Sequence, residues 1–257
     1  MERMNREELI SKIISKKEFS ELPKKDVEKV LDKFDNDRFV DSEKVKMARD
    51  LLRKMYTVFV SNKLLNIKDK NKEWVLKKHM STRERFDFYK KLYNKLLRDF
   101  ENPIIFDLGC GVNSFSYEFF SKKVSYVGVE AVRQLVDFSN YYLQKNKFDG
   151  IVYHESLFDY KKVKKIIKIK EGPKIVFLFK ALDSLEMLDR DYSKKLLSEI
   201  VPLVDRVVVS FATRSLVSGK RFDVKRYWFE NFVKKEFDIL EDFELGNERY
   251  IVFESKN

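Results

Sequence analysis

Apolar positions in the first part of the chain recur at helical spacing. Between Glu7 and Ser15 the apolar residues fall on one side of a helix, at Leu9, Ile10, Ile13 and Ile14. A second helical segment starts near Pro23, a residue suited to the first turn of a helix, and continues to Phe34. A third is expected over residues 42–59. This part of the chain is therefore predicted to be helical.

The helical pattern continues after a polar stretch at residues 62–72, which we expect to be a loop. Ser81 and Thr82 can cap a fourth helix that runs to Phe100, with Glu84 in the capping-box position three residues after Ser81. No strand pattern precedes residue 103, so the first hundred residues form a helical region.

After Pro103 short β-branched or aromatic runs alternate with helix-length segments. The expected strands are 104–108, 126–130, 151–154, 174–179, 206–211, 237–244 and 249–254. The expected helices are 116–121, 132–145, 160–169, 191–200 and 223–235. Alternation predicts a doubly wound α/β domain with a parallel sheet. Gly246-Asn247 forms a hairpin turn between the last two strands. A terminal antiparallel hairpin is typical of the class I (Rossmann-like) seven-strand methyltransferase sheet, whereas a dehydrogenase more often continues with helices.

Composition places the chain among globular proteins. It has 257 residues, 44% of them hydrophobic, and no apolar run approaches the ~18 residues that span a bilayer. The N-terminus is charged from Glu2 onward, unlike a secretory signal. A single cysteine, Cys110, forms no internal disulfide and no zinc cluster. We expect a cytoplasmic monomer with no metal and no membrane association.

The net charge of +11 is unevenly distributed along the chain. Residues 1–50 carry 13 basic and 13 acidic side chains, whereas residues 51–100 carry 14 basic and 5 acidic ones, a net +9. Clustered cations favour nucleic acid, because they displace the counterions of phosphates. A lysine-rich surface that only contacts solvent explains the same excess, so both interpretations stay open.

A glycine motif follows the first predicted strand. The segment Ile-Phe-Asp-Leu-Gly-Cys-Gly ends at Gly111 and contains Asp107 and Gly109. Glycines let the backbone turn sharply beneath a ligand at the carboxyl end of a strand. Ser114 occupies the third glycine position of a dinucleotide fingerprint, and the loop has no Walker lysine. The motif therefore favours S-adenosylmethionine over NAD or ATP.

Residues after the second and third strands extend this candidate cofactor site. Glu130 ends the second strand about 20 residues after the glycines, where an acid accepts hydrogen bonds from ribose hydroxyls. Ala131 follows it directly. Ser156 and Leu157 follow the third strand, where an adenine would lie, although ordinary loop packing explains them nearly as well.

The residues after the fourth strand, Phe179 to Ser184, limit the chemistry. They contain neither the Asp/Asn-Pro-Pro-aromatic box used on exocyclic amines nor the Pro-Cys pair used on pyrimidine rings. Acceptors that are already nucleophilic remain, such as N7 of guanine, and for these positioning supplies most of the rate. We therefore expect no general base and assign no catalytic residue.

The sequence resembles the aminoglycoside-resistance 16S ribosomal RNA (guanine-N7) methyltransferases over about residues 50–256. The matching blocks are His79–Arg85, Phe106–Gly111, Phe179–Leu182, Ser210-Phe211, Ser215-Leu216, Gly219-Lys220 and Trp228–Glu230. Members of that family have a basic helical N-terminal domain that docks on the small ribosomal subunit. The resemblance implies such a domain at residues 1–78, a methyltransferase domain at 79–257 and ribosomal RNA within the small subunit as the partner.

The resemblance also implies roles for individual residues. Arg85 would hold the methionine carboxylate of S-adenosylmethionine, with His79 and Ser81 in the same pocket. Lys180 would lie beside the point of methyl transfer. The RNA entrance would be lined by Arg214, Lys220 and Arg221.

The chain departs from this family at two places. The proline that follows the fourth strand is replaced by Asp183, and segment 222–227 is short and lacks the family's Gly-Met and Asn-Tyr pairs. These departures leave the RNA site and the methylated atom open. Two other functions stay open as well: a small-molecule methyltransferase, and a non-catalytic RNA-binding factor that retains the cofactor fold.

Overall fold

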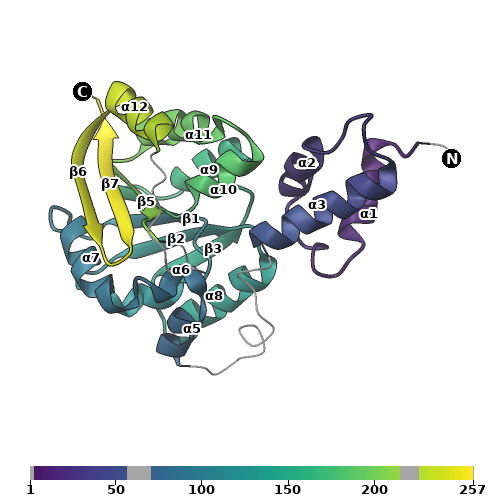
Figure 1. The fold of residues 1–257 in the computed structure, drawn as a ribbon. Coiled ribbons are helices and arrows are strands. Elements are labelled where there is room, and N and C mark those ends of the chain that lie inside the picture. Colours follow the sequence, from purple (N-terminus) through teal and green to yellow (C-terminus); the bar gives the residue numbers. More distant parts are fainter. Residues whose placement is uncertain (1–2, 57–70, 215–225, 257) are drawn as a thin grey trace.

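The computed structural model describes residues 3–56, 71–214 and 226–256. They form a helical lobe at the N-terminus and a larger lobe built on one sheet (Figure 1). The helical lobe consists of α1 (Arg6–Ile14), α2 (Lys24–Asp32) and α3 (Asp41–Tyr56). The three helices predicted here are therefore confirmed as far as residue 56, and the loop expected at 62–72 lies almost wholly outside the described residues.

Each helix of this lobe buries one apolar face. Asn5 and Glu8 form a reciprocal capping box at the start of α1, which satisfies two free backbone amides. Ile13, Val30 and Leu52, one from each helix, are fully buried and belong to the same apolar cluster. Burial of these faces against one another holds the helices together.

The fourth predicted helix is wrong as a single element. Between residues 72 and 96 the chain instead forms α5 (Lys72–Lys78), α6 (Met80–Arg83), the 3-10 turn η2 (Phe86–Phe88) and α7 (Tyr89–Leu96). Ser81 lies inside α6, and its hydroxyl accepts a hydrogen bond from Arg85. Glu84 forms an ion pair with Lys180. Other contacts, one local and one long-range, thus occupy the side chains that a capping box would use.

The seven predicted strands are confirmed and form one sheet. They are β1 (Ile104–Leu108), β2 (Ser125–Glu130), β3 (Gly150–His154), β4 (Lys174–Phe179), β5 (Arg206–Ala212), β6 (Phe237–Leu245) and β7 (Glu248–Ser255). Their order is β3-β2-β1-β4-β5-β7-β6. β1 to β5 pair in parallel, and β7 is antiparallel to both β5 and β6. The chain therefore has a doubly wound sheet with an antiparallel hairpin at one edge.

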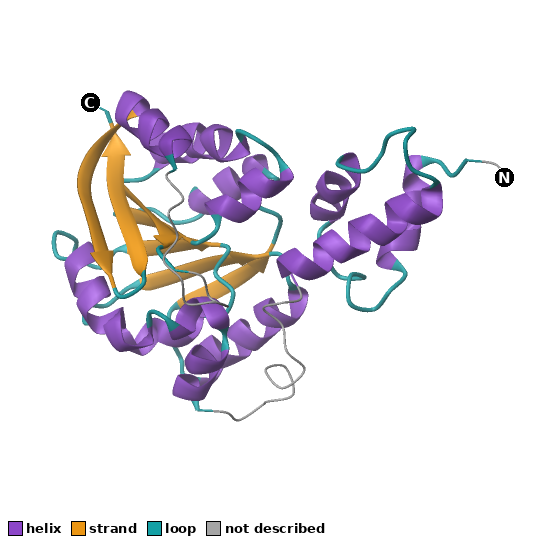
Figure 2. Cartoon of the chain, viewed as in Figure 1, coloured by secondary structure: helices purple, strands orange, loops and turns teal. Residues whose placement is uncertain are grey.

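Helices cover both faces of the sheet (Figure 2). The remaining elements are η3 (Asn113–Phe119), α8 (Arg133–Lys145), α9 (Tyr160–Ile167), α10 (Leu182–Leu188), α11 (Tyr192–Ile200), η4 (Val201–Leu203) and α12 (Tyr227–Glu236). Alternate residues of β1 belong to different cores: Ile104, Phe106 and Leu108 pack on one face, and Ile105 packs on the other. The sequence prediction missed α10, and residues 223–225 of the last predicted helix lie outside the described residues.

The final hairpin is placed by a close contact with the helical segment before β1. Gly246 has a φ of 64°, and a Cβ atom added there would lie 2.7 Å from the ring of Phe88. Only glycine fits this turn, so the tip of the hairpin can lie against η2. Because β7 is antiparallel, its first residue, Glu248, stands opposite Ala212 at the carboxyl end of β5. No helix among the described residues is long and apolar enough to cross a membrane.

Candidate functional site

A cavity of about 290 Å³ lies at the carboxyl ends of β1, β2 and β4. This is the edge at which open α/β sheets bind ligands. Of the residues predicted for the cofactor and the reacting centre, those that line the cavity are His79, Ser81, Arg85, Asp107, Gly109, Gly111, Glu130, Ala131, Leu157 and Lys180. The structure therefore brings together residues that lie as far apart in the sequence as His79 and Lys180.

The loop after β1 forms the floor of the cavity. Gly109 and Gly111 have φ angles of 76° and 53°, which side chains of other residues rarely tolerate. A Cβ atom on Gly111 would lie 3.1 Å from the ring of His79, so the loop and this ring are in close contact. The glycines leave the backbone exposed to whatever occupies the cavity.

Asp107 holds this loop from below. Its Oδ2 accepts hydrogen bonds from Asn113 Nδ2 and from the Tyr126 hydroxyl, each at 2.7 Å. Burial raises the pKa of Asp107, an effect that the hydrogen bonds from Asn113 and Tyr126 oppose. Asp107 thus fixes the shape of the glycine loop from the side of the sheet.

Glu130 joins the glycine loop to the end of β2. Its Oε2 accepts a hydrogen bond from the Gly111 amide at 2.8 Å, and its Oε1 accepts one from the Val132 amide at 2.9 Å. Burial raises the pKa of Glu130, while these backbone donors favour the charged form. Each carboxylate oxygen can accept a second hydrogen bond, as from the two hydroxyls of a ribose.

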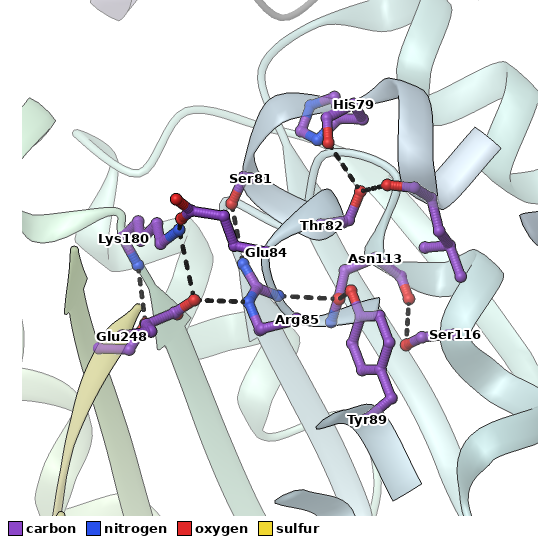
Figure 3. Close-up of polar contacts among 12 residues, drawn as sticks. His79, Ser81, Thr82, Glu84, Arg85, Tyr89, Asn113, Ser116, Lys180 and Glu248 are labelled. Carbon is purple, nitrogen blue, oxygen red and sulfur yellow. Dashed lines mark hydrogen bonds and ion pairs between the residues drawn. The ribbon is translucent and has the colours of Figure 1, made fainter. Parts of the chain in front are cut away.

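Arg85 lies in a buried polar network at the side of the cavity (Figure 3). Its Nε donates to Glu248 at 3.1 Å, its Nη1 to Asn113 Oδ1 at 3.0 Å and its Nη2 to the Ser81 hydroxyl at 2.8 Å. The guanidinium also lies 4.7 Å from the centre of the Phe179 ring. Among the described residues these contacts use three of its five N–H groups, which leaves two for a ligand carboxylate.

Lys180 shares the acidic partner of Arg85. Its Nζ lies 3.3 Å from Glu248 and forms a second ion pair with Glu84 (Figure 3). Lys180 has a φ of 58°, a left-handed conformation at the end of β4 that turns the chain into α10. A strained residue at a cavity of this kind indicates a functional constraint.

His79 is the neutral member of this cluster. Burial, together with the positive charges of Arg85 and Lys180, lowers the pKa of His79 to about 4. The ring is therefore uncharged at neutral pH and packs against Gly111 as a flat surface.

The loop after β3 contributes differently from what the sequence suggested. Leu157 lines the cavity together with the next residue, Phe158. Ser156 is buried, and its hydroxyl accepts a hydrogen bond from the Phe158 amide at 3.0 Å, but it does not line the cavity. In this structure Ser156 shapes the loop that presents Leu157.

The residues predicted for an RNA entrance are only partly described. Arg214 is exposed at the end of β5 and does not line the cavity, whereas Lys220 and Arg221 lie outside the described residues. Asp183, which replaces the expected proline, lines the cavity and forms a two-pronged ion pair with Arg226. This pair connects the start of α10 to the start of α12.

Several residues of the site have no local signature in the sequence. The cavity is also lined by Asp26, Met55, Tyr56, Asn113, Val132, Leu135 and Phe158, and Glu248 stands behind it. Asp26, Met55 and Tyr56 come from α2 and α3, so the helical lobe supplies part of the wall. Only the amphipathic pattern of α2 offered a hint, because Asp26 adjoins the buried positions of that helix.

Known proteins share this fold over the whole chain. The structure of the 16S rRNA methylase RmtB matches with a TM-score of 0.79 and 21% sequence identity, and the match covers 99% of this chain and 100% of RmtB. The 16S rRNA methyltransferase RmtF, solved in complex with S-adenosyl-L-homocysteine, matches with a TM-score of 0.80 and 19% sequence identity. This match covers 98% of this chain and 100% of RmtF. The class I fold predicted from the sequence is thereby confirmed.

Sequence comparison identifies relatives with a stated activity. A 16S rRNA (guanine(1405)-N(7))-methyltransferase of Proteus mirabilis is 27% identical over 188 residues, which are 69% of this chain and 63% of that relative. The match therefore spans less than two thirds of the relative's length. Residues 46–249 match the ribosomal RNA methyltransferase (FmrO) family, and this range contains β1 to β6 and every cavity-lining residue except Asp26. The chain belongs to the ribosomal RNA methyltransferase (FmrO) family.

Proposed function

We propose that the protein is an S-adenosylmethionine-dependent methyltransferase that methylates N7 of a guanine in 16S ribosomal RNA. The observation that supports this function most is that Glu130, the glycine loop and Arg85 line the same cavity. The names of its relatives supply the substrate: the Proteus mirabilis protein is a 16S rRNA guanine-N7 methyltransferase, and the family is one of ribosomal RNA methyltransferases.

The residues present fit S-adenosylmethionine from end to end. Glu130 would accept hydrogen bonds from the ribose hydroxyls, and the two N–H groups of Arg85 that described residues leave free would bind the methionine carboxylate. Gly109 and Gly111 leave room for the part of the cofactor that joins the ribose to the methionine carboxylate. Leu157 and Leu135 offer apolar contact to the adenine. Uncharged His79 and the hydroxyl of Ser81 would line the methionine end.

S-adenosylmethionine supplies an electrophilic methyl group on a sulfonium. Guanine N7 carries an exposed lone pair, so no proton has to be removed before it attacks. The task of the protein is then to bind and orient both partners, and orientation alone can supply much of the rate. Lys180, at the left-handed turn after β4, would stand beside the transfer point.

We further propose that residues 1–78 dock on the small ribosomal subunit and that residues 79–257 carry the transfer reaction. Arg214, Lys220 and Arg221 would contact the RNA near the target base. This division agrees with the helical lobe in the structure, although α5 packs with the sheet lobe through Val75 and Leu76. The protein would act as a monomer.

Transfer of a labelled methyl group tests the proposed function. Purified protein is incubated with labelled S-adenosylmethionine and, in parallel, with small subunits, with deproteinised 16S rRNA and with no RNA. Labelled RNA is then cleaved chemically at N7-methylguanine to locate the site. Label in small subunits with cleavage at one guanine supports the proposal. Cofactor binding without transfer to either RNA would indicate a different substrate, and no cofactor binding would refute the assigned activity.

A further inference from the structure

Asp26 is a buried carboxylate in the wall of the cavity. It lies in α2, is 2% exposed and lines the cavity from the side of the helical lobe. Its neighbours Val27, Val30 and Leu31 are fully buried in the apolar core. An acidic side chain is rarely buried at such a position without a partner that compensates for the removal of its hydration water.

The two oxygens of Asp26 have different surroundings. Oδ1 accepts a hydrogen bond from the Tyr56 hydroxyl, at the end of α3. Oδ2 is buried and makes no hydrogen bond to any residue that the structure describes. Buried polar atoms are nearly always hydrogen-bonded, so an oxygen of this kind at a cavity indicates a group that arrives with a ligand.

The position of Asp26 relative to Glu130 suggests which part of the ligand it meets. Both carboxylates line the same cavity, and the charge of Asp26 adds to burial in raising the pKa of Glu130. The Ser156 hydroxyl lies beside Asp26 and opposes the rise that burial causes in the pKa of Asp26. Leu157 and Phe158, which directly follow Ser156 in the chain, line the same cavity. A nucleoside whose ribose binds Glu130 would therefore extend its base between apolar side chains toward Asp26.

The carboxylate of Asp26 stands beside apolar side chains in the cavity, and a carboxylate in such surroundings selects a hydrogen-bond donor. An ionised carboxylate only accepts hydrogen bonds, and a purine with an exocyclic amine at position 6 presents a donor at its far end. A ring nitrogen or a carbonyl there would instead face the carboxylate with a second acceptor and be disfavoured. The chemistry of this part of the cavity therefore matches an aminopurine.

We propose that Asp26 Oδ2 accepts a hydrogen bond from the exocyclic amine of the adenine of S-adenosylmethionine, so that the helical lobe completes the cofactor site. This inference rests on the proposed function, because it presupposes that the cavity holds this cofactor. Ion pairs hold α2 against the sheet lobe, Lys25 with Asp159 at 3.0 Å and Lys29 with Asp189 at 2.7 Å. The acceptor thus reaches the cavity on a docked helix.

Calorimetry with two ligands tests the assignment. We compare S-adenosylhomocysteine with its analogue in which the 6-amino group is replaced by hydrogen, at pH 8, above the pKa of about 6 that burial gives Asp26. The proteins are the unchanged chain, Asp26→Leu and Glu28→Gln. The last is a matched control, since it removes a carboxylate that pairs with Lys24 on the same helix and does not line the cavity.

The unchanged chain and Glu28→Gln are expected to prefer the amine-bearing ligand by about 10- to 100-fold, the range for one hydrogen bond to a charged group. Asp26→Leu is expected to bind both ligands within a factor of about three, because its side chain distinguishes neither group. Equal binding of the two ligands by the unchanged chain would overturn the inference even if no variant folds. A preference retained in Asp26→Leu would overturn it as well. If neither ligand binds the unchanged chain, the proposed function falls with it, which is a separate result.

Discussion

Glu248, the first residue of β7, accepts a hydrogen bond from Nε of Arg85 at 3.1 Å, and both side chains are buried. The two residues are 163 positions apart in the sequence. The contact exists because β7 runs antiparallel to β5 and therefore begins beside the carboxyl end of that strand. The terminal hairpin therefore forms the edge of the sheet and also fixes the arginine proposed to bind the methionine carboxylate.

Replacing Arg85 by alanine should affect both binding and stability. Loss of a charge-assisted hydrogen-bonded pair should weaken cofactor binding by about 2 kcal/mol. The variant should also lose roughly 3 kcal/mol in free energy of unfolding, because removal of one partner leaves the buried carboxylate of Glu248 with Lys180 as its remaining cation. Calorimetry with S-adenosylhomocysteine and denaturant unfolding measure the two effects.

A double variant separates these contributions. Arg85→Ala combined with Glu248→Gln should recover much of the stability, because the buried negative charge is removed, but should bind the cofactor as weakly as Arg85→Ala. If Arg85→Ala keeps the affinity of the parent while remaining folded, the arginine serves only to support the fold.

Gly109→Arg should abolish cofactor binding without unfolding the protein. A Cβ atom at this position meets Ala181 and Leu157 at 3.4 and 3.5 Å, ordinary contact distances, so the main costs are the left-handed φ of 76° and the longer side chain in the cavity. The strain amounts to roughly 1–2 kcal/mol. Titration with S-adenosylmethionine should show no binding, and a thermal unfolding curve should show a modest fall in Tm.

A second glycine outside the cavity serves as the control. Gly172 has a φ of 130°, and a Cβ atom there would lie 3.5 Å from Ile104, so Gly172→Ala is also strained. It should lower the Tm and leave cofactor affinity unchanged. Parent-like affinity in Gly109→Arg would show that the cofactor lies elsewhere.

The sequence alone predicts those parts of the fold and site that depend on local patterns. Runs of β-branched residues between turn signals located every strand, and β1 and β4 match the predicted ends. Gly109 and Gly111 could be found because a tight loop at the end of a strand requires glycine whatever surrounds it. Glu130 could be found from its spacing to that loop.

Other residues of the site depend on contacts that no short segment encodes. Glu248 and Asp26 reach the cavity from the last strand and from the second helix, so their roles are visible only once the chain has folded. Ser81 and Glu84 matched a capping box, but Ser81 instead accepts a hydrogen bond from nearby Arg85, and Glu84 pairs with Lys180 from the end of β4.

The stability of the protein should show the titration of Asp26. Burial raises the pKa of this carboxyl from 3.8 to about 6. A carboxyl with a raised folded-state pKa stabilises the folded state fully below pH 3.8, and this stabilisation disappears as the pH rises through 6. The difference of about two pKa units corresponds to at most about 3 kcal/mol.

Asp26→Asn removes this titration and keeps an acceptor for the Tyr56 hydroxyl. Relative to the parent, the variant should therefore gain up to about 3 kcal/mol in free energy of unfolding between about pH 4 and about pH 7.5. Urea unfolding of the parent and the variant at both pH values measures this difference. Other groups, such as His79, titrate in both proteins, so their effect cancels. A constant difference between the proteins would show that the pKa of Asp26 is not raised.

The last prediction concerns the basic segment at residues 51–100 as an RNA-docking surface. The test positions in this segment are Lys70, Lys72, Lys77 and Lys78, of which Lys70 lies outside the described residues. Lys72 pairs with Glu118, and Lys77 lies 3.7 Å from Glu73 and 4.3 Å from the ring centre of Phe86. Phosphates would compete with these surface ion pairs, which contribute little to stability. Replacing all four by glutamine should therefore leave the fold intact.

The quadruple variant should bind small subunits more weakly, and its affinity should depend less on salt, by roughly one unit of logarithmic slope for each phosphate that a lysine no longer neutralises. Cofactor affinity should not change, and transfer should recover at saturating RNA, because Lys72, Lys77 and Lys78 do not line the cavity. Lys234→Gln with Lys235→Gln, on α12 at the opposite side of the sheet lobe (Figure 1), is the matched control and should keep the parent's slope. A parent-like slope in the quadruple variant would mean that docking lies elsewhere, with Arg214, Lys220, Arg221 and the lysines of segment 161–170 as the next candidates.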